Sequence, residues 1–195
     1  MEKFVNHIHS SLTKNQNLPE DTLASIYYSL EILINTIVKL LIPMVVFLVI
    51  GQIDMYFYIL LFTISTRTFI GGVHFSSFIG CTLFTTVFFL LICFLAQTAI
   101  VSQTAGICIF VFAILVFALY APVISRNRPE YDKRQRSRFK MIAITVTVIY
   151  LAIFLSTKSW DFAQVILWGV CLSTIQLLIG KEVNRYYERK TVQVQ

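Results

Sequence analysis

The class of fold is decided by an uncharged stretch, Phe78-Ile-Gly-Cys81-Thr-Leu-Phe-Thr-Thr-Val-Phe-Phe-Leu-Leu-Ile-Cys93-Phe-Leu-Ala96. A helix of about twenty mostly apolar residues is long enough to cross the hydrocarbon core of a bilayer, so this stretch predicts a transmembrane helix. The same criterion predicts six such helices along the chain. They cover residues 32–50, 53–68, 78–96, 100–120, 141–157 and 160–180.

The overall composition agrees with this prediction. The chain has 195 residues, of which 57% are hydrophobic, and its mean hydropathy is +0.75. These values indicate a polytopic, all-α membrane protein and exclude an ordinary soluble domain. We expect one membrane-embedded domain over residues 1–195, with an amphipathic N-terminal segment (1–31), a helical bundle (32–180) and a cytoplasmic tail (181–195).

Charged residues gather in a few segments outside the apolar runs. The basic residues of the 121–140 loop are Arg126, Arg128, Lys133, Arg134, Arg136, Arg138 and Lys140. The loops near 51–54, 97–104 and 157–161 carry only Asp54, Lys158 and Asp161. Since basic loops stay in the cytoplasm, we expect both termini and the 67–81 segment on the cytoplasmic side of the cell membrane. A basic loop beside apolar helices indicates contact with anionic lipid headgroups, not with nucleic acid.

The N-terminal part has its own helix signals. Apolar residues on one face of Lys3–Leu12 predict a short helix lying on the membrane surface. Pro19, followed by two acidic residues, predicts the start of the next helix. Within that helix, Lys39 is expected to reach toward the cytoplasmic headgroups, and Pro43 is a candidate kink.

One His–Cys pair lies between the second and third apolar runs. His74 is the only histidine beyond the first ten residues, and Cys81 follows it by seven positions. A thiol attacks a carbonyl as the thiolate, and an adjacent imidazole can take its proton and return it to the leaving amine. The pair therefore predicts nucleophilic catalysis, although a lone His and a lone Cys at this spacing can also arise by chance.

The spacing of the pair restricts the local structure. On one unbroken helix the two residues would be separated by roughly 10 Å along the axis, and His74 would lean away from Cys81. We therefore expect the chain to bend between them, with His74 in a loop and Cys81 in the first turn of the third transmembrane helix. That position would also favour the thiolate, because the helix dipole is positive there.

Other groups near the pair could stabilise a tetrahedral intermediate. The candidates are the guanidinium of Arg67 and the backbone N–H groups of Gly71, Gly72 and Gly80. The alternatives are structural, with the Gly-Gly pair a helix break and Arg67 a positive-inside anchor. No second histidine or carboxylate lies close to His74 in the sequence, so we expect neither a metal site nor a cofactor.

These motifs resemble the AgrB family of membrane peptide-processing endopeptidases. The resemblance rests on three features of the chain: Arg67-x3-Gly71-Gly72-x-His74-x6-Cys81, the Tyr120-Ala121-Pro122 segment with the basic stretch to Arg128-Pro129, and the arrangement of apolar runs. It extends over nearly the whole chain.

The resemblance implies a specific reaction. Proteins of this kind cleave the acidic C-terminal part from an AgrD-like propeptide in quorum sensing and keep the rest as a thioester on the enzyme cysteine. A cysteine or serine of the peptide then closes a thiolactone or lactone ring. Here Cys81 would be the nucleophile and His74 the general base, with the basic residues Arg126, Arg128, Arg134, Arg136 and Arg138 attracting the acidic tail. The resemblance also implies a homodimer.

Two other functions remain open at the level of sequence. One is a non-enzymatic small-peptide transporter or membrane assembly partner, but the middles of the last four apolar runs lack the charged residues usual in transport sites. The other is a hydrolase that releases a linear peptide. The mass of the product would separate hydrolysis from cyclisation, because a cyclic product is lighter by one water.

Overall fold

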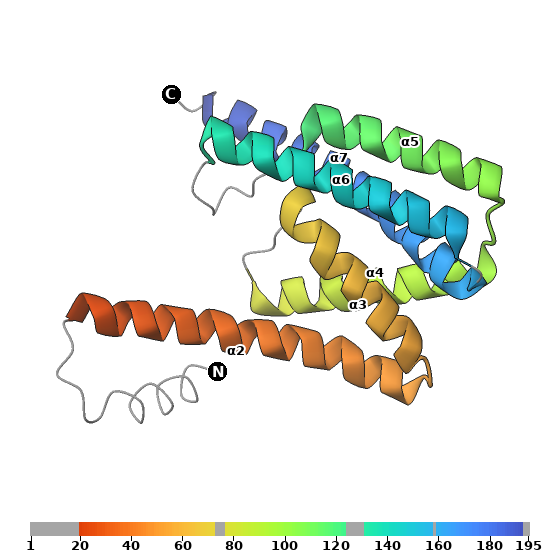
Figure 1. Cartoon of the computed structure of the whole chain (residues 1–195). Coiled ribbons are helices and arrows are strands. Elements are labelled where there is room, and N and C mark those ends of the chain that lie inside the picture. The colour runs from red at the N-terminus through yellow and green to blue at the C-terminus, as the bar shows by residue number, and fades with distance from the viewer. Residues whose placement is uncertain (1–19, 73–76, 124–130, 158, 193–195) are drawn as a thin grey trace.

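The computed structural model describes residues 20–72, 77–123, 131–157 and 159–192. These residues form six α-helices and no extended strand (Figure 1), which confirms the predicted all-α class. The helices are α2 (Glu20–Val49), α3 (Ile53–Ile70), α4 (Phe78–Thr98), α5 (Gln103–Tyr120), α6 (Lys133–Ser156) and α7 (Trp160–Val192). The predicted surface helix Lys3–Leu12 lies outside the described residues.

Five of the described helices, α3 to α7, are long and apolar enough to cross a membrane. The sixth predicted span, 32–50, corresponds to Leu33–Val49, which is the apolar part of the longer helix α2. This part is shorter than the other five, and its apolar run contains the charged residue Lys39. By length and composition the described chain therefore has five candidate spans where the sequence predicts six.

The helix boundaries follow local signals in the sequence. Helix α2 begins at Glu20, as the proline and the acidic residues predict, and it continues through Pro43 to Val49. Helix α6 begins after Asp132, whose carboxylate accepts a hydrogen bond from the Lys133 N–H at 2.8 Å. Helix α7 extends to Val192, beyond the predicted end at 180, so most of the predicted tail continues this helix.

Helix α7 lies at the centre of the bundle and packs against α3, α4, α5 and α6. Figure 1 shows α5, α6 and α7 side by side, with α3 crossing toward α2 and α4. Two clusters of buried side chains result. The first joins α3, α5, α6 and α7 around Phe62, Phe110 and Leu167, and the second joins α2, α3, α4 and α7 around Phe47 and Phe89. Helices α3 and α7 contribute to both clusters and hold the bundle together.

Buried polar groups tie α7 to the connection between α4 and α5. The Gln164 side chain accepts a hydrogen bond from the Val101 N–H and donates one to the Val101 carbonyl, both at 3.2 Å. The Trp168 indole N–H donates to the Ala99 carbonyl at 3.0 Å. Backbone groups that are not in a helix need such partners where water is scarce.

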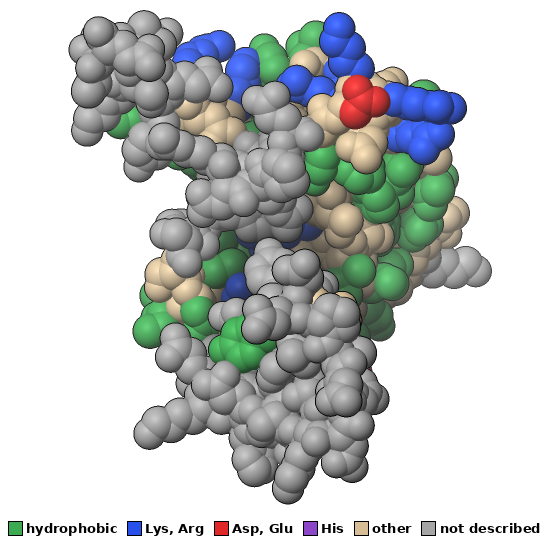
Figure 2. Space-filling view, turned by 90° about the vertical axis from the view of Figure 1, so that its left-hand side faces the viewer, with side chains coloured by type: hydrophobic (Ala, Val, Ile, Leu, Met, Phe, Trp, Pro, Cys, Tyr) green, Lys and Arg blue, Asp and Glu red, His purple; other side chains and the backbone are tan. Residues whose placement is uncertain are grey.

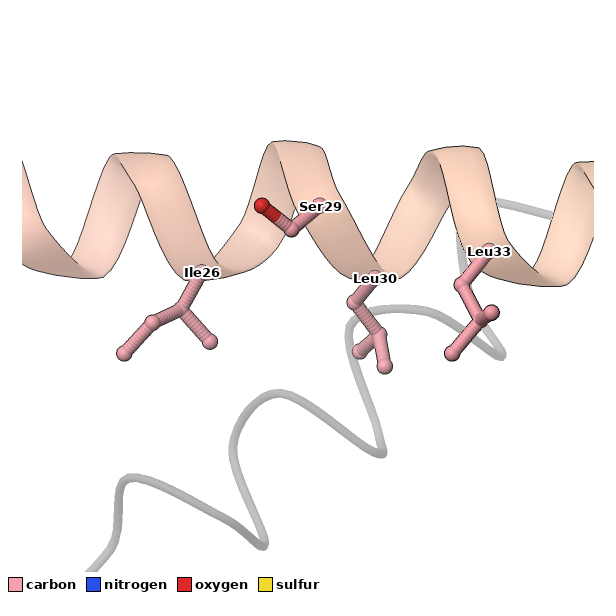
Figure 3. A pocket seen from close by; sticks show the side chains of 4 residues that line it. All are labelled: Ile26, Ser29, Leu30 and Leu33. Carbon is pink, nitrogen blue, oxygen red and sulfur yellow. The ribbon is translucent and has the colours of Figure 1, made fainter.

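The two halves of α2 differ in their environment. The second half packs on α3 and α4, with the Phe47 ring 5.9 Å from that of Tyr56. In the first half, Ile26, Leu30 and Leu33 point to the same side of the helix (Figure 3). Together with Ser29 they border a pocket of about 300 Å³. This apolar face agrees with the amphipathic pattern predicted for the start of the helix.

Close packing of α5 on α6 gives the first testable prediction. A Cβ atom added at Gly106 would lie 2.5 Å from the Phe154 ring, so Gly106→Leu should overpack this contact. We expect a loss of about 1–3 kcal/mol in stability, measured as a lower apparent Tm in lipid nanodiscs. The matched control is Ala105→Leu, because the adjacent Ala105 is exposed in the structure. Equal Tm values for the two variants would contradict the prediction.

Candidate active site

Cys81 lies in the first turn of α4. The helix begins at Phe78, after Ser77, whose backbone is extended at φ −84° and ψ 134°. The Cys81 N–H donates to the Ser77 carbonyl at 3.0 Å and makes the first hydrogen bond of the helix. These features exclude an unbroken helix from His74 to Cys81. His74 itself lies outside the described residues, so its pairing with Cys81 stays a prediction.

The hydroxyl groups that follow Cys81 bond to their own helix. Thr82 donates to the Phe78 carbonyl, and Thr85 donates to the Cys81 carbonyl, each at 2.9 Å. Thr86 donates to the Thr82 carbonyl at 2.9 Å. These hydroxyls are therefore satisfied within α4, which is the usual behaviour of threonine inside a helix.

Arg67 reaches from the last turn of α3 to the surface of α4. Its guanidinium carbon lies 5.8 Å from the centre of the Phe84 ring and 6.0 Å from that of Phe88. The guanidinium also lies close enough to Cys81 to interact with it electrostatically. Cation–π contact with two rings thus holds a positive charge beside the proposed nucleophile.

A second cation approaches the same part of α4. The Lys39 ammonium, from α2, lies 5.4 Å from the centre of the Phe78 ring. The sequence suggested only that Lys39 reaches toward headgroups, whereas the structure gives it an aromatic partner at the start of α4. The signal that could have identified it is its charge inside an apolar run, since such residues often mark functional sites.

Cys81 lies between the rings of α4 that the two cations contact. At about 100° per residue, Phe78, Cys81 and Phe88 lie within roughly 80° of one another around the helix, with Cys81 between the other two. Lys39 contacts the ring on one side of the cysteine, and Arg67 contacts the rings on the other side. One cation from α2 and one from α3 therefore lie over rings of α4 on either side of Cys81.

The Gly-Gly pair after α3 joins two segments that are far apart in the sequence. The Val123 N–H donates to the Ile70 carbonyl at 3.1 Å, and the Gly72 N–H donates to the Val123 carbonyl at 3.3 Å. We call these contacts the Gly71–Val123 junction. It directly connects the Gly71-Gly72 motif with the segment that follows Tyr120-Ala121-Pro122. The Tyr120 ring in turn carries the Lys181 ammonium 3.3 Å from its centre.

The junction changes the role expected for the two glycines. Their amide N–H groups are already bonded, that of Gly71 to the Arg67 carbonyl at 3.1 Å and that of Gly72 to Val123. They are therefore not free to bind an oxyanion in this structure. The N–H groups of Phe78, Ile79 and Gly80 come before the first hydrogen bond of α4 and have no acceptor in a preceding helical turn, as at any helix start. They are the better backbone candidates.

Gln176 of α7 is a polar residue that the sequence did not single out. It is buried and borders the junction, because a Cβ atom added at Gly72 would lie 3.5 Å from its amide nitrogen. That nitrogen has no hydrogen-bond acceptor among the residues that the structure describes. In the sequence it stands among the apolar residues of α7 like an ordinary core residue, so the pattern alone does not single it out.

The basic residues at the start of α6 form an exposed surface, which we call the basic segment. It consists of Lys133, Arg134, Arg136, Arg138 and Lys140, of which the first four are exposed. Figure 2 shows Lys and Arg side chains gathered along the top of one face, and others set back in a hollow below. Arg126 and Arg128 lie outside the described residues. Among the described residues, the one salt bridge joins Arg185 to Glu182 at 3.0 Å, so the basic segment has no acidic partner there.

The apolar helices and the polar site between them define a multi-pass membrane protein. Residues 2–177 match the sequence profile of the AgrB family, Accessory gene regulator B. The chain belongs to this family. Membership supports a role in peptide processing for agr quorum sensing, and it confirms the resemblance predicted from the motifs.

Curated relatives point to the same family. The chain is 25% identical over 167 residues to an AgrB-like protein of Clostridium beijerinckii, covering 85% of this chain and 81% of the relative. It is 27% identical over 161 residues to one of Halalkalibacterium halodurans, covering 82% and 80%. It is 25% identical over 184 residues to AgrB-like protein 2 of Clostridium perfringens, covering 87% and 86%. No solved structure matches the chain.

The junction gives the second prediction. Gly71 has a φ of 77°, and a Cβ atom there would collide with the Val123 carbonyl group, so Gly71→Ala should break the junction and lower the apparent Tm. The matched control is Gly51→Ala, because Gly51 has a similar φ of 71° and no atom near its Cβ position. We expect about 1 kcal/mol of destabilisation for the control, from backbone strain alone, and clearly more for Gly71→Ala. An equal loss of stability in the two variants would show that the close contact with Val123 does not contribute to stability.

Proposed function

We propose that this protein is a membrane cysteine endopeptidase that cleaves an AgrD-like propeptide and closes the retained part into a thiolactone or lactone ring. Cys81 is the nucleophile and His74 the general base. The observation that supports this most strongly is the location of Cys81, at a helix start and beside the Arg67 guanidinium. A helix start and a nearby cation are the kind of surroundings in which catalytic cysteines are found.

The proposed reaction has two steps. His74 takes the Cys81 proton as the sulfur attacks the scissile carbonyl, and it returns that proton to the leaving amine as the C–N bond breaks. The retained peptide is now a thioester on Cys81. A thiol or hydroxyl of the same peptide then attacks the thioester carbonyl, which forms the ring and releases the Cys81 sulfur. Donors for the oxyanion are the Arg67 guanidinium and the first-turn amides of α4.

The environment of the site favours ring closure over hydrolysis. Many large apolar side chains of α4, including Ile79 and Leu83, are exposed on the protein surface, as expected for a helix that faces lipid. Water is scarce at such a boundary, so the thioester is protected, while the tethered peptide group reacts at high effective concentration.

We also propose how the protein sits in the membrane. With the apolar part of α2 as the sixth crossing, both termini, the basic segment and the active site are cytoplasmic, since the basic residues are concentrated in these parts of the chain. The chain is one membrane-embedded domain in contact with lipids, and it acts as a homodimer, as its family membership leads us to expect. The substrate is an AgrD-like propeptide, and the reaction needs no cofactor.

The third prediction concerns the thioester. The wild-type protein in nanodiscs, incubated with the AgrD-like peptide encoded beside its gene, should carry a covalent peptide adduct in intact-mass analysis. Cys81→Ala should show none, because the nucleophile is absent, and His74→Ala should form it roughly 10²–10⁴-fold more slowly. The released product should be lighter by one water than the linear peptide.

The outcomes separate the candidate functions. Peptide binding without adduct or cleavage would favour a non-enzymatic transporter or assembly partner. A linear product would indicate hydrolysis, and cleavage by Cys81→Ala would mean that another group is the nucleophile.

The fourth prediction concerns the basic segment, which we propose attracts the acidic tail of the substrate. Replacing Arg134, Arg136 and Arg138 together by Gln should lower kcat/KM by about tenfold at low salt, because charge complementarity accelerates encounter. Added salt should have the same effect on the wild type. The control replaces the three residues by Lys, which keeps the charge and should keep the rate. Unchanged processing in the Gln variant would contradict this role.

A further inference from the structure

Lys39 and Arg67 are two cations that lie over aromatic rings of α4. Neither forms a salt bridge with a described residue, and Arg67 also interacts electrostatically with Cys81. The ring contacts offset only part of the cost of keeping a charge among apolar groups, since a cation–π contact contributes roughly 0.5–2 kcal/mol. A pair of cations kept in such a place has the electrostatic character of a site for an anion.

The location of the two cations limits what that anion can be. Lys39 contacts Phe78, one turn before Cys81, while Arg67 contacts Phe84 and Phe88 after it. The rings that the two cations contact therefore flank Cys81 along α4, one turn before it and one turn after it. An anion held by both cations would lie along this part of α4, as would a substrate that reacts with Cys81.

The Cys81 sulfur is near only one of the two cations as far as the structure records. Arg67 interacts electrostatically with Cys81, whereas Lys39 forms no salt bridge with any residue that the structure describes. The Lys39 ammonium is a compact charge with three donors on a flexible stem, so it can follow a carboxylate that approaches the thiol.

We propose that Lys39, together with Arg67, forms an anion subsite that binds a carboxylate of the peptide substrate beside the scissile bond. This inference rests on the proposed function, because it takes a peptide to be the molecule that reacts at Cys81. It makes Lys39 a specificity-determining residue and predicts that the preferred substrate carries an acidic residue next to the bond that is cut.

The test needs no peptide. Iodoacetate and iodoacetamide both alkylate a thiolate, with an S–C bond forming as the C–I bond breaks and iodide leaving. Iodoacetate carries a carboxylate next to the reacting carbon, and iodoacetamide is its neutral counterpart. The rate of Cys81 alkylation by each would be followed by peptide-mapping mass spectrometry, which separates Cys81 from Cys93, Cys108 and Cys171. The full-length protein would be held in nanodiscs of zwitterionic lipid.

The ratio of the two rates reports the subsite alone. Any change in the ionisation or exposure of Cys81 affects both reagents equally and cancels. In Lys39→Gln the iodoacetate-to-iodoacetamide ratio should fall at least about fivefold, as expected for the loss of one charge contact. Arg67→Gln should also lower the ratio, whereas Lys39→Arg should keep it. The control is Arg185→Gln, which removes a basic residue paired elsewhere and should leave the ratio unchanged.

The inference would be overturned by a ratio that does not change in Lys39→Gln, or by an equal fall in Arg185→Gln. A lower ratio without any peptide adduct on the wild-type protein would support the anion subsite and contradict the proposed reaction. A peptide adduct on the wild-type protein, combined with an unchanged iodoacetate-to-iodoacetamide ratio in Lys39→Gln, would support the proposed reaction and contradict the anion subsite.

Discussion

The Gly71–Val123 junction is the constraint on which the active-site region depends. At this junction the chain leaves α3, and its backbone N–H and C=O groups no longer find hydrogen-bond partners within a helix. In a membrane these groups need partners elsewhere in the protein. The Ile70 carbonyl and the Gly72 N–H find them on Val123, which follows α5. Because the Gly71 N–H also bonds to the Arg67 carbonyl, the end of α3 is held in place. The Arg67 side chain therefore starts from a fixed point and can reach α4.

The helices could be predicted because their signals are local. Uncharged runs of sufficient length give α3 to α7, and the start of α2 at Glu20 follows from the residues around it. The position of Cys81 in the first turn of α4 was also predictable, because an unbroken helix would have separated it from His74. The apolar part of α2, Leu33–Val49, is shorter than the other five candidates, so length and composition support the first predicted span less than the rest.

The site could be predicted only in part, for a physical reason. A sequence pattern indicates that glycine is needed at positions 71 and 72, but not whether the amide group or the missing side chain matters. The structure uses both for the junction, and it leaves no free amide there for an oxyanion. The contact with Val123 joins residues more than fifty positions apart, and no periodicity in the sequence encodes such a pairing. The contact of Lys39 with the Phe78 ring likewise depends on how α2 packs against α4.

The two cations beside Cys81 act where electrostatic interactions are strongest. The same charge separation that contributes about 1 kcal/mol in water contributes several times more where the effective dielectric constant is low. The aromatic rings of α4 hold the cations without neutralising them, whereas a carboxylate would cancel their charge. Their charge therefore remains available to an anionic group that approaches the first turns of α4. Since the junction fixes Arg67 and α2 carries Lys39, the position of these charges depends on packing between helices, and changes far from Cys81 in the sequence can alter its reactivity.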